Sequence, residues 1–507
     1  MDCQMLPLEV FETILTYLDL DSVKALRLTN RGLAGKCIGP RFLATIQQPI
    51  FEVSLENLRS FHALACSPSL SKRIHSLTLL ATSLDSSELE KNVKCGQYAA
   101  RSLNGPFFES STIDYSPEEL SKAISDLGWL REQQQARANE SSSEMVKLLQ
   151  LALEGFSKLD SIHLDAAFML GRTNRESADY GEWHPLWMRA SHVFSVLLTA
   201  IVHSGVSVKK LDIYRDTPRC CIPSGRITTY ASTFSPGQLG ILGKGLESLK
   251  LSMSGEIHDT LDIAGSEDED GWGGLLSRDD PRAVLADGTP GIVSLLKPAS
   301  ALRELDLSFR NTLIDGKLES YDRIIASISQ ETQFPSLETC ALSGFMAKGE
   351  SILLLLQKHA DLHSLTLHEC TLTTGSWTPI ISHIDQSMPS LQSLSLSNLY
   401  GKHTQNLKYA QNADSVDSNG RDQQEEEGEQ EVDGIMNLHP VWDTDQQPRS
   451  RYLQEPGGKC VHTRSFTREE LKKGLVFRPL RRGWGRVKGS FELMQWRKSR
   501  RALYGPP

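Results

Sequence analysis

One segment of the sequence holds glycines and a lysine that could cradle a phosphate group. The run GQLGILGKG at 237–245 has part of the G-x-x-x-x-G-K-[ST] pattern, in which backbone N–H groups, a lysine and a hydroxyl bind the phosphates and magnesium. Counted from Gly237, that pattern needs glycine where Leu242 stands, and Gly245 lacks the hydroxyl. We therefore expect no nucleotide site in this segment.

A second grouping, of histidines and a cysteine, could bind zinc. His359, His363, His368 and Cys370 are close together in the sequence, and zinc sites use such side chains. A strand over 362–367 would aim His363 and His368 at opposite faces, because side chains alternate along a strand. We expect no metal site here. No catalytic serine, cysteine or metalloprotease motif occurs elsewhere, so we predict a protein without enzymatic activity or cofactor.

The C-terminal segment 449–507 has a composition that could bind nucleic acid. It holds sixteen Lys or Arg against four Asp or Glu, interleaved with Trp484, Phe491, Trp496 and Tyr504. Basic groups neutralise phosphates and aromatic rings stack on bases. The same side chains could instead pack on the folded body, or WRKSRR could act as a nuclear import signal. The sequence leaves these interpretations open.

A repeated motif indicates the elements that must position any functional side chain. The pattern L-x-x-L-x-L recurs, with substitutions, eight times between residues 70 and 400. Its fourth positions are Leu77, Ile162, Leu211, Leu249, Leu305, Cys340, Leu365 and Leu394. Helix-compatible stretches separate the motifs; one has a Ser141–Glu144 capping box and another begins at Ser191. This alternation predicts a parallel α/β sheet with helices on its outer face.

Three short helices are predicted within the first forty residues. An apolar stripe is formed by Val10, Ile14, Leu15 and Leu18. Asp21 can cap a second helix whose Val23, Leu26 and Leu28 point inward, and Thr29, Asn30 and Arg31 begin a third. So short a unit buries little surface alone. It is either a docking element for another protein or the N-terminal cap of the fold that follows.

This N-terminal segment, 1–45, resembles an F-box. The order Leu6-Pro7-x-Glu9, then Ile14-Leu15-x-x-Leu18, an acidic turn and LRLTNRGL carries the resemblance. The resemblance implies docking onto a Skp-type adaptor and, through it, a cullin scaffold of a ubiquitin ligase. The residues implied in that docking surface or its core are Leu6, Pro7, Glu9, Ile14, Leu15, Leu18, Leu28 and Leu33.

Most of 70–400, within a predicted domain at 46–400, resembles the repeat region of leucine-rich F-box proteins. The resemblance implies an irregular leucine-rich-repeat solenoid with parallel strands and outer helices, although the long spacings early in the chain leave room for a non-repeat domain between 80 and 200. Outward positions beside the strand leucines would line a concave sheet. The residues expected to contact a target protein there are Lys210, Asp212, Tyr214, Lys250, Glu304, Asp306 and His368.

The boundaries of the C-terminal regions are indicated by changes in charge along the sequence. The chain has 507 residues and a formal net charge of −9, of which the last 59 residues carry +12 and the rest −21. Between the body and the basic end, 401–448 includes DSNGRDQQEEEGEQEVDG. A segment with so few apolar residues cannot offset the entropy cost of folding. It is predicted to be a disordered acidic linker.

Three classes of protein are excluded at this stage. No stretch of 18 consecutive apolar residues predicts a membrane span. The N-terminus MDCQMLPLEV lacks the basic region and the long apolar region that a secretory signal contains. Nine irregularly spaced cysteines fit a reducing compartment better than a disulfide framework. We expect a cytoplasmic or nuclear protein.

Two functions remain for such a chain. The first is a substrate-recognition subunit of a Skp/cullin/F-box ubiquitin ligase, whose F-box docks the adaptor while the repeat region binds a target for degradation. The alternative is a nucleic-acid-associated or structural scaffold that acts through the basic segment 449–507.

Overall fold

The computed structural model describes most of the chain. The described residues are 7–15, 20–37, 48–100, 111–157, 159–172, 175–178, 183–217, 219–255, 290–310, 321–406, 429–442, 451–454 and 460–478. The acidic run 407–428 and the aromatic residues Trp484, Phe491, Trp496 and Tyr504 lie outside them.

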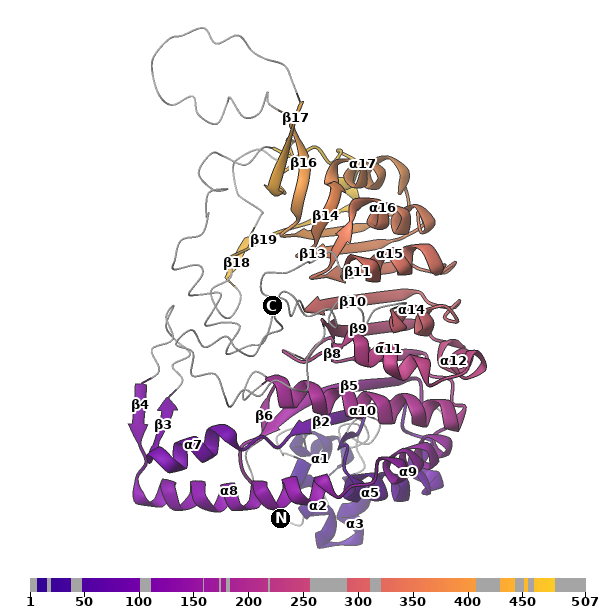
Figure 1. Ribbon diagram of the computed structural model, residues 1–507. Coiled ribbons are helices and arrows are strands. Elements are labelled where there is room, and N and C mark those ends of the chain that lie inside the picture. Colours follow the sequence, from indigo (N-terminus) through magenta and orange to yellow (C-terminus); the bar gives the residue numbers. More distant parts are fainter. Residues whose placement is uncertain are drawn as a thin grey trace.

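All eight repeated motifs form strands of one large, mostly parallel sheet. These strands are β2 (Ser76–Ser83), β5 (Ser161–Met169), β7 (Lys210–Ile213), β9 (Ser248–Ser254), β10 (Glu304–Arg310), β11 (Thr339–Ser343), β13 (Ser364–His368) and β15 (Ser393–Ser397). They lie side by side in chain order, stacked along the molecule (Figure 1). The predicted α/β fold with a parallel sheet is confirmed.

The fourth positions of the motifs form one row across this sheet. Leu77 pairs with Ile162, and the register continues through Leu211, Leu249, Leu305, Cys340 and Leu365 to Leu394. All eight side chains are buried in one continuous core. Parallel strands of alternating polarity bury their apolar side chains only in this register, because a shift of one residue turns every side chain over.

Helices cover one face of the sheet (Figure 1). They include α5 (Leu55–Ala65), α9 (Ser142–Gly155), α10 (Trp183–Ser204), α11 (Ser224–Ser232), α12 (Pro236–Gly243), α14 (Gly291–Leu296), α15 (Asp322–Glu331), α16 (Gly349–Lys358) and α17 (Trp377–Ser387). Ser141 caps α9 by accepting from the Glu144 N–H. Ser191 does not begin a helix: it lies inside α10, where its hydroxyl donates to the Trp187 carbonyl.

Helix α10 is the longest apolar helix of the body. Over His184–Ser204 it has the length and composition of a membrane span, and 67% of an apolar 18-residue window within it is buried inside the fold. Burial on this scale is typical of a central helix of an α/β fold.

An insertion between β2 and β5 explains the long first spacing of the repeat. It contains α7 (Ser87–Cys95), β3 (Gln97–Ala100), β4 (Ser111–Asp114) and α8 (Pro117–Ala138). At the end of α8, Arg137 donates to the Thr82 carbonyl and forms an ion pair with Glu52 at 2.5 Å. Glu52 belongs to β1 (Ile50–Glu52), the strand that flanks β2. This pair therefore attaches the insertion to the N-terminal edge of the sheet.

A second, smaller sheet and a C-terminal hairpin lie at the β15 end of the large sheet. The small sheet contains β12 (Met346–Lys348), β14 (Thr371–Ser376), β16 (Tyr400–Asn406) and β17 (Glu429–Ile435). The prediction of a disordered linker over 401–448 is wrong for residues 401–406, which belong to β16, and for residues 429–442, which include β17. Backbone pairing with β16 orders the acidic strand β17 although it has few apolar side chains to bury.

The C-terminal hairpin extends the large sheet. Strand β19 (Cys460–Thr467) pairs antiparallel with β15, and β18 (Arg451–Gln454) pairs with β19. Helix α19 (Arg468–Leu471) follows directly, with the Thr467–Glu470 capping box that its sequence indicates. Phe466 and Leu475 join the main core. The described part of segment 449–507 therefore packs on the folded body, which extends well past residue 400.

Candidate functional site

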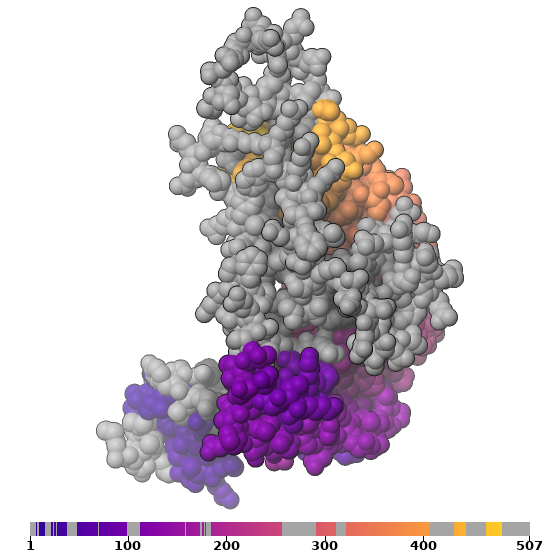
Figure 2. All heavy atoms as spheres, turned by 60° about the vertical axis from the view of Figure 1, so that its left-hand side comes forward, coloured from indigo at the N-terminus to yellow at the C-terminus, as the bar shows by residue number. Residues whose placement is uncertain are grey.

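The N-terminal helices form a unit with its own small core. They are α1 (Leu8–Leu15), α2 (Leu20–Thr29) and α3 (Arg31–Lys36), and we call them the helical trio. Its core consists of Phe11, Leu15, Val23, Leu33 and Cys37 and is separate from the core of the sheet. Asn30 caps α3 by accepting from the Leu33 N–H at 2.8 Å. Figure 2 shows the trio (indigo) at one end of the molecule.

Three large apolar side chains lie on the outside of the trio. Val10 is 46% exposed, Ile14 40% and Leu28 88%. The prediction that Leu28 points inward is wrong, because Val23 and Leu26 supply the packed face of α2. In α1 the inward pair is Phe11 and Leu15, which leaves Val10 and Ile14 outside.

The residues implied in adaptor docking divide between core and surface. Leu15 and Leu33 belong to the core, whereas Pro7, Ile14 and Leu28 are exposed. Glu9 lies in the first turn of α1. Leu6 and Leu18 lie outside the described residues.

A second candidate surface lies on the face of the large sheet opposite the buried leucines. It is formed by polar residues of adjacent strands, Lys210, Asp212, Lys250, Glu304 and Asp306, and we call it the polar sheet face. In the strand register Asp212 lies next to Lys250, and Lys250 lies next to Asp306. Opposite charges therefore alternate across three strands. The structure thus brings together five of the seven residues expected to contact a target.

Two charges of this face, those of Lys250 and Glu304, are paired with each other. Lys250 Nζ lies 3.1 Å from Glu304 Oε1, and the Ser248 hydroxyl donates to Glu304 Oε2 at 2.7 Å. Partial burial acts to raise the pKa of Glu304. The hydrogen bonds from Ser248 and Lys250 outweigh this effect and hold that pKa below its ordinary value. His163 Nδ1 lies 3.8 Å from Asp212 Oδ2. Ion pairs of this exposure contribute about 0–1 kcal/mol each.

Arg215 is a member of this face that the sequence pattern does not identify. Its Nε donates to Asp306 Oδ1 at 2.7 Å, and its Nη2 lies 3.4 Å from the Ser343 hydroxyl. The side chain therefore reaches from the end of β7 to β11. Burial raises the pKa of Asp306 in spite of Arg215. With Arg215 the face holds three cations and three carboxylates, so its positive and negative charges balance.

Tyr214 does not belong to the polar sheet face, and its prediction as a target-binding residue is wrong. It is fully buried, and its hydroxyl lies 3.1 Å from the Ala190 carbonyl, to which it donates. The strand β7 ends at Ile213, and Tyr214 takes a left-handed backbone with φ 56°. That turn interrupts the alternation of side chains on which the prediction depends.

Beyond β10 the same face carries hydroxyl groups in place of charges. The residues in register are Thr339, Ser364 and Ser393 in one row and Ala341, Thr366 and Ser395 in the next. The Ser393 hydroxyl donates to that of Ser364 at 2.8 Å. His368, at the end of β13, lies on this uncharged part, away from the other predicted residues. Nothing in this arrangement supplies a nucleophile with an adjacent base.

Three segments with glycines, histidines or cysteines have a defined place in the fold. The glycine-rich run forms helix α12, capped by Ser235 and Gln238, and not a phosphate-binding loop. Cys220 and Cys221 are buried, and burial raises the pKa of both thiols. Among the described residues no three His, Cys, Asp or Glu side chains are grouped as metal ligands.

His359 is held as a neutral core residue. Its Nε2 accepts from the Phe334 N–H at 3.1 Å, and its Nδ1 lies 2.8 Å from the Leu355 carbonyl. The ring stacks on that of Phe334 at 5.5 Å. Burial lowers the pKa of His359, and the neighbouring Lys358 adds to that effect.

Acidification should therefore destabilise the protein through His359. Its contribution to stability is complete above the unfolded-state pKa of about 6.5 and is lost as the pH falls toward the lower folded-state pKa, by at most about 1.4 kcal/mol per pH unit. Urea unfolding between pH 7 and pH 5 should show this slope, and His359→Gln should reduce it. The exposed His363→Gln is the control, and an equal slope in both variants would contradict the assignment.

Comparisons with known proteins do not assign a family. No family model matches the sequence, and a comparison with curated proteins finds no significant match.

Proposed function

We propose that this chain is the substrate receptor of a ubiquitin ligase, with the helical trio as an F-box that binds a Skp-type adaptor and, through it, a cullin. In this proposal the sheet and its helices are an irregular leucine-rich-repeat solenoid. The uniform register of the eight motif strands and their one-sided cover of helices support that description. The polar sheet face holds the target protein.

The exposed apolar side chains of the trio are the observation that carries the proposal. A unit whose core contains five buried residues still leaves Val10, Ile14 and Leu28 in water. Full burial of one such side chain contributes about 1.5–3 kcal/mol. Another polypeptide that covers these side chains would gain most of that energy at Leu28 and about half of it at Val10 and Ile14, which are already partly buried. The order of residues in the F-box-like segment is what points to a Skp-type adaptor.

The division into two surfaces fits a receptor that does no chemistry. The target is held on the sheet while the trio is attached to the ligase, whose conjugating enzyme transfers ubiquitin. Tethering raises the local concentration of the target at that enzyme, to the millimolar range for short flexible connections. No step of this process requires a catalytic group on this chain.

Co-purification with a Skp-type adaptor tests the proposal. Ile14→Asp places a charge on the face to be covered, so adaptor binding by the full-length chain should fall at least about tenfold, the equivalent of 1.4 kcal/mol. Ile124→Asp on α8 is the matched control, because Ile124 is an isoleucine of similar exposure, 52% against 40% for Ile14. Adaptor binding that is absent in the unmodified chain, or equal in the two variants, would refute the proposal.

A further inference from the structure

The small sheet ends in a strand that is paired on one side. Its order is β12-β14-β16-β17, so among the described residues β17 has only β16 as a neighbour (Figure 1). The N–H of Met436, which follows β17, donates to the Leu399 carbonyl on the β16 side. Alternate residues of a strand direct their backbone groups to opposite sides. The backbone groups of Glu431, Asp433 and Ile435 therefore point away from β16, and we call them the open edge of β17.

A short antiparallel ladder lies just beyond this strand. Pro440 and Phe477 form its bridge. The Val441 N–H donates to the Val476 carbonyl, and the Arg478 N–H donates to the carbonyl of residue 439. Residues 439 and 441 are odd-numbered, like the three residues of the open edge. The ladder is therefore in phase with that edge, and the chain that follows Arg478 is directed back along β17.

That following chain carries the charge opposite to that of β17. Residues 479–507 contain eight Lys or Arg and one Glu. The carboxylates of Glu431 and Asp433 are exposed, and neither forms an ion pair with another described residue. A second copy of β17 on this edge would bring like charges together, which destabilises a strand pair. Charge complementarity favours the basic segment as the occupant.

Continuing the ladder places a basic residue opposite an acidic one. Glu431 is nine residues before Pro440, and Arg486 is nine residues after Phe477. The two stand directly opposite each other if both strands stay extended and antiparallel. In the same register Pro479 is out of phase with the residues that point to β17. Its missing N–H faces solvent, where a sheet tolerates proline.

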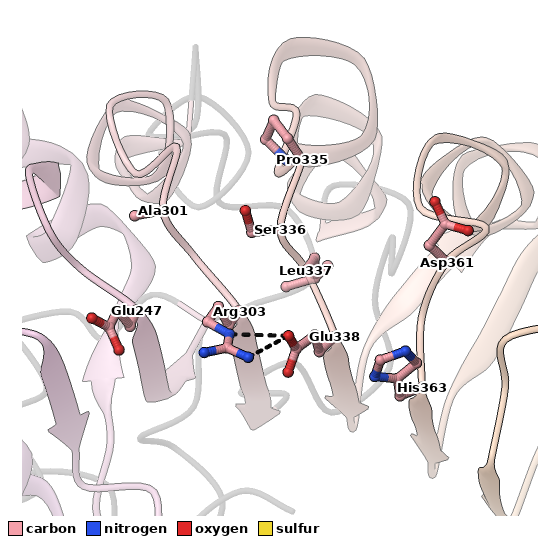
Figure 3. A pocket seen from close by; sticks show the side chains of 9 residues that line it. All are labelled: Glu247, Ala301, Arg303, Pro335, Ser336, Leu337, Glu338, Asp361 and His363. Atoms are coloured by element: carbon pink, nitrogen blue, oxygen red, sulfur yellow. Dashed lines mark hydrogen bonds and ion pairs between the residues drawn. The ribbon is translucent and has the colours of Figure 1, made fainter.

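A charge pair of this kind already joins two neighbouring strands elsewhere in the molecule. Arg303 and Glu338 directly precede β10 and β11 and lie opposite each other where these strands start (Figure 3). Nε of Arg303 donates to Glu338 Oε1 at 3.0 Å. This hydrogen bond raises the pKa of Arg303. Arginine and glutamate at opposed positions of adjacent strands thus reach each other in this fold.

We propose that residues 480–488, which lie outside the described part of the chain, bind the open edge of β17 as an additional antiparallel strand of the small sheet. Main-chain hydrogen bonds to that edge supply the affinity, and the pair of Arg486 with Glu431 fixes the register. The occupied edge no longer offers unpaired backbone groups to other chains. This inference is independent of the proposed ligase function.

Hydrogen exchange of the full-length chain, resolved to single amides by mass spectrometry with fragmentation, tests this inference. Trp484→Pro removes an N–H that points to β17 in the proposed register. The open edge should exchange at least about fivefold faster in this variant than in the unmodified chain, the factor that one backbone hydrogen bond supplies. Gly485→Pro is the matched control, because its N–H points away from β17 and the slow exchange should remain.

An exchange of charges tests the register. Glu431→Arg places two arginines opposite each other, so the slow exchange of the open edge should be lost. Adding Arg486→Glu should restore it, whereas adding Arg497→Glu, which gives the same net charge, should not. Equal recovery in the two double variants would overturn the register, because it would show diffuse attraction. The amides of Val432 and Gly434, which point to β16, report in every variant that β17 itself is still paired.

Three results would overturn the inference. Fast exchange of the open edge in the unmodified chain, with slow exchange on the β16 side, would show that no strand is bound there. Slow exchange that depends on protein concentration would show that a second copy is the occupant. Equal effects of Trp484→Pro and Gly485→Pro would show that the segment does not pair with β17 in the proposed phase. Adaptor binding by the trio should be the same in both proline variants, so it is tested separately.

Discussion

Replacing Gly344 by alanine should lower the free energy of unfolding by about 3 kcal/mol or more. Gly344 directly follows β11 and has a left-handed backbone with φ 74°, which costs an L-residue about 1–2 kcal/mol. A Cβ atom there would lie 2.1 Å from the Phe309 carbonyl oxygen. Backbone cannot move aside as a flexible side chain can, so this overlap should add about 1–3 kcal/mol. Urea denaturation followed by circular dichroism measures the change.

Two further variants identify the cause of that loss. The equivalent places after β13 and β15 are taken by Glu369 and Asn398, with φ 52° and 44°, so the turn itself accepts other residues. If the Phe309 carbonyl is what requires glycine, Gly344→Asn should destabilise about as much as Gly344→Ala. Gly128→Ala, inside α8 with no atom within 4 Å of the new Cβ, should stabilise by about 0.5–1 kcal/mol. Full recovery in Gly344→Asn would show that backbone strain alone is responsible.

The strands were predictable from the sequence because their signal is local. In ALRELDL, Leu305 and Leu307 are two residues apart, so they point to the same side of a strand, and both are buried in the structure; Leu302, which precedes the strand, is buried as well. Pairing such segments in parallel places Leu305 beside Leu249 and Cys340 without further information. The mixed α/β class and the parallel sheet follow from that pattern.

Residues at the ends of elements could not be placed in the same way. Tyr214 and Leu28 were assigned by continuing the period of a strand and of a helix. Tyr214 lies one residue beyond β7 in a left-handed turn, and its buried hydroxyl bonds to α10. Leu28 lies near the end of α2, where Val23 and Leu26 already fill the small core. In both cases packing against another element decides the direction of the side chain, and no short pattern contains that information.

The candidate surfaces were predictable to different degrees. The alternating charges of Asp212, Lys250 and Asp306 follow from strand periodicity. The place of Arg215 in this face does not, because it depends on the turn that follows β7. Strand β17 was predicted wrongly for a different reason. Its composition predicts disorder, but seven of its residues pair with residues of β16, and this pairing orders the strand. Composition indicates how much apolar surface a segment can bury. It does not indicate whether the edge of a sheet is available for the segment to pair with.

Removing the side chain of Arg464 should destabilise the C-terminal end of the fold by about 3–5 kcal/mol. Arg464 lies on β19 opposite Leu396, so it points into the core, and it is only 2% exposed. Its guanidinium forms an ion pair with Glu470 at 3.1 Å and lies over the rings of Trp442 and Phe466 at 5.9 and 5.3 Å. Arg464→Ala would leave a cavity and a half-buried carboxylate without its cation. Both effects are costly where water cannot replace the lost group.

A matched set of variants separates charge from packing at this position. Arg468→Ala removes an exposed arginine of α19 and should change the unfolding free energy by less than about 0.5 kcal/mol. Arg464→Met combined with Glu470→Gln removes the buried pair while it keeps most of the volume, so it should recover part of the stability lost in Arg464→Ala. Urea unfolding and the rate of trypsin cleavage within 451–478 report on this end of the sheet. If Arg464→Ala and Arg468→Ala were equally mild, the ion pair would not hold β19 to the core.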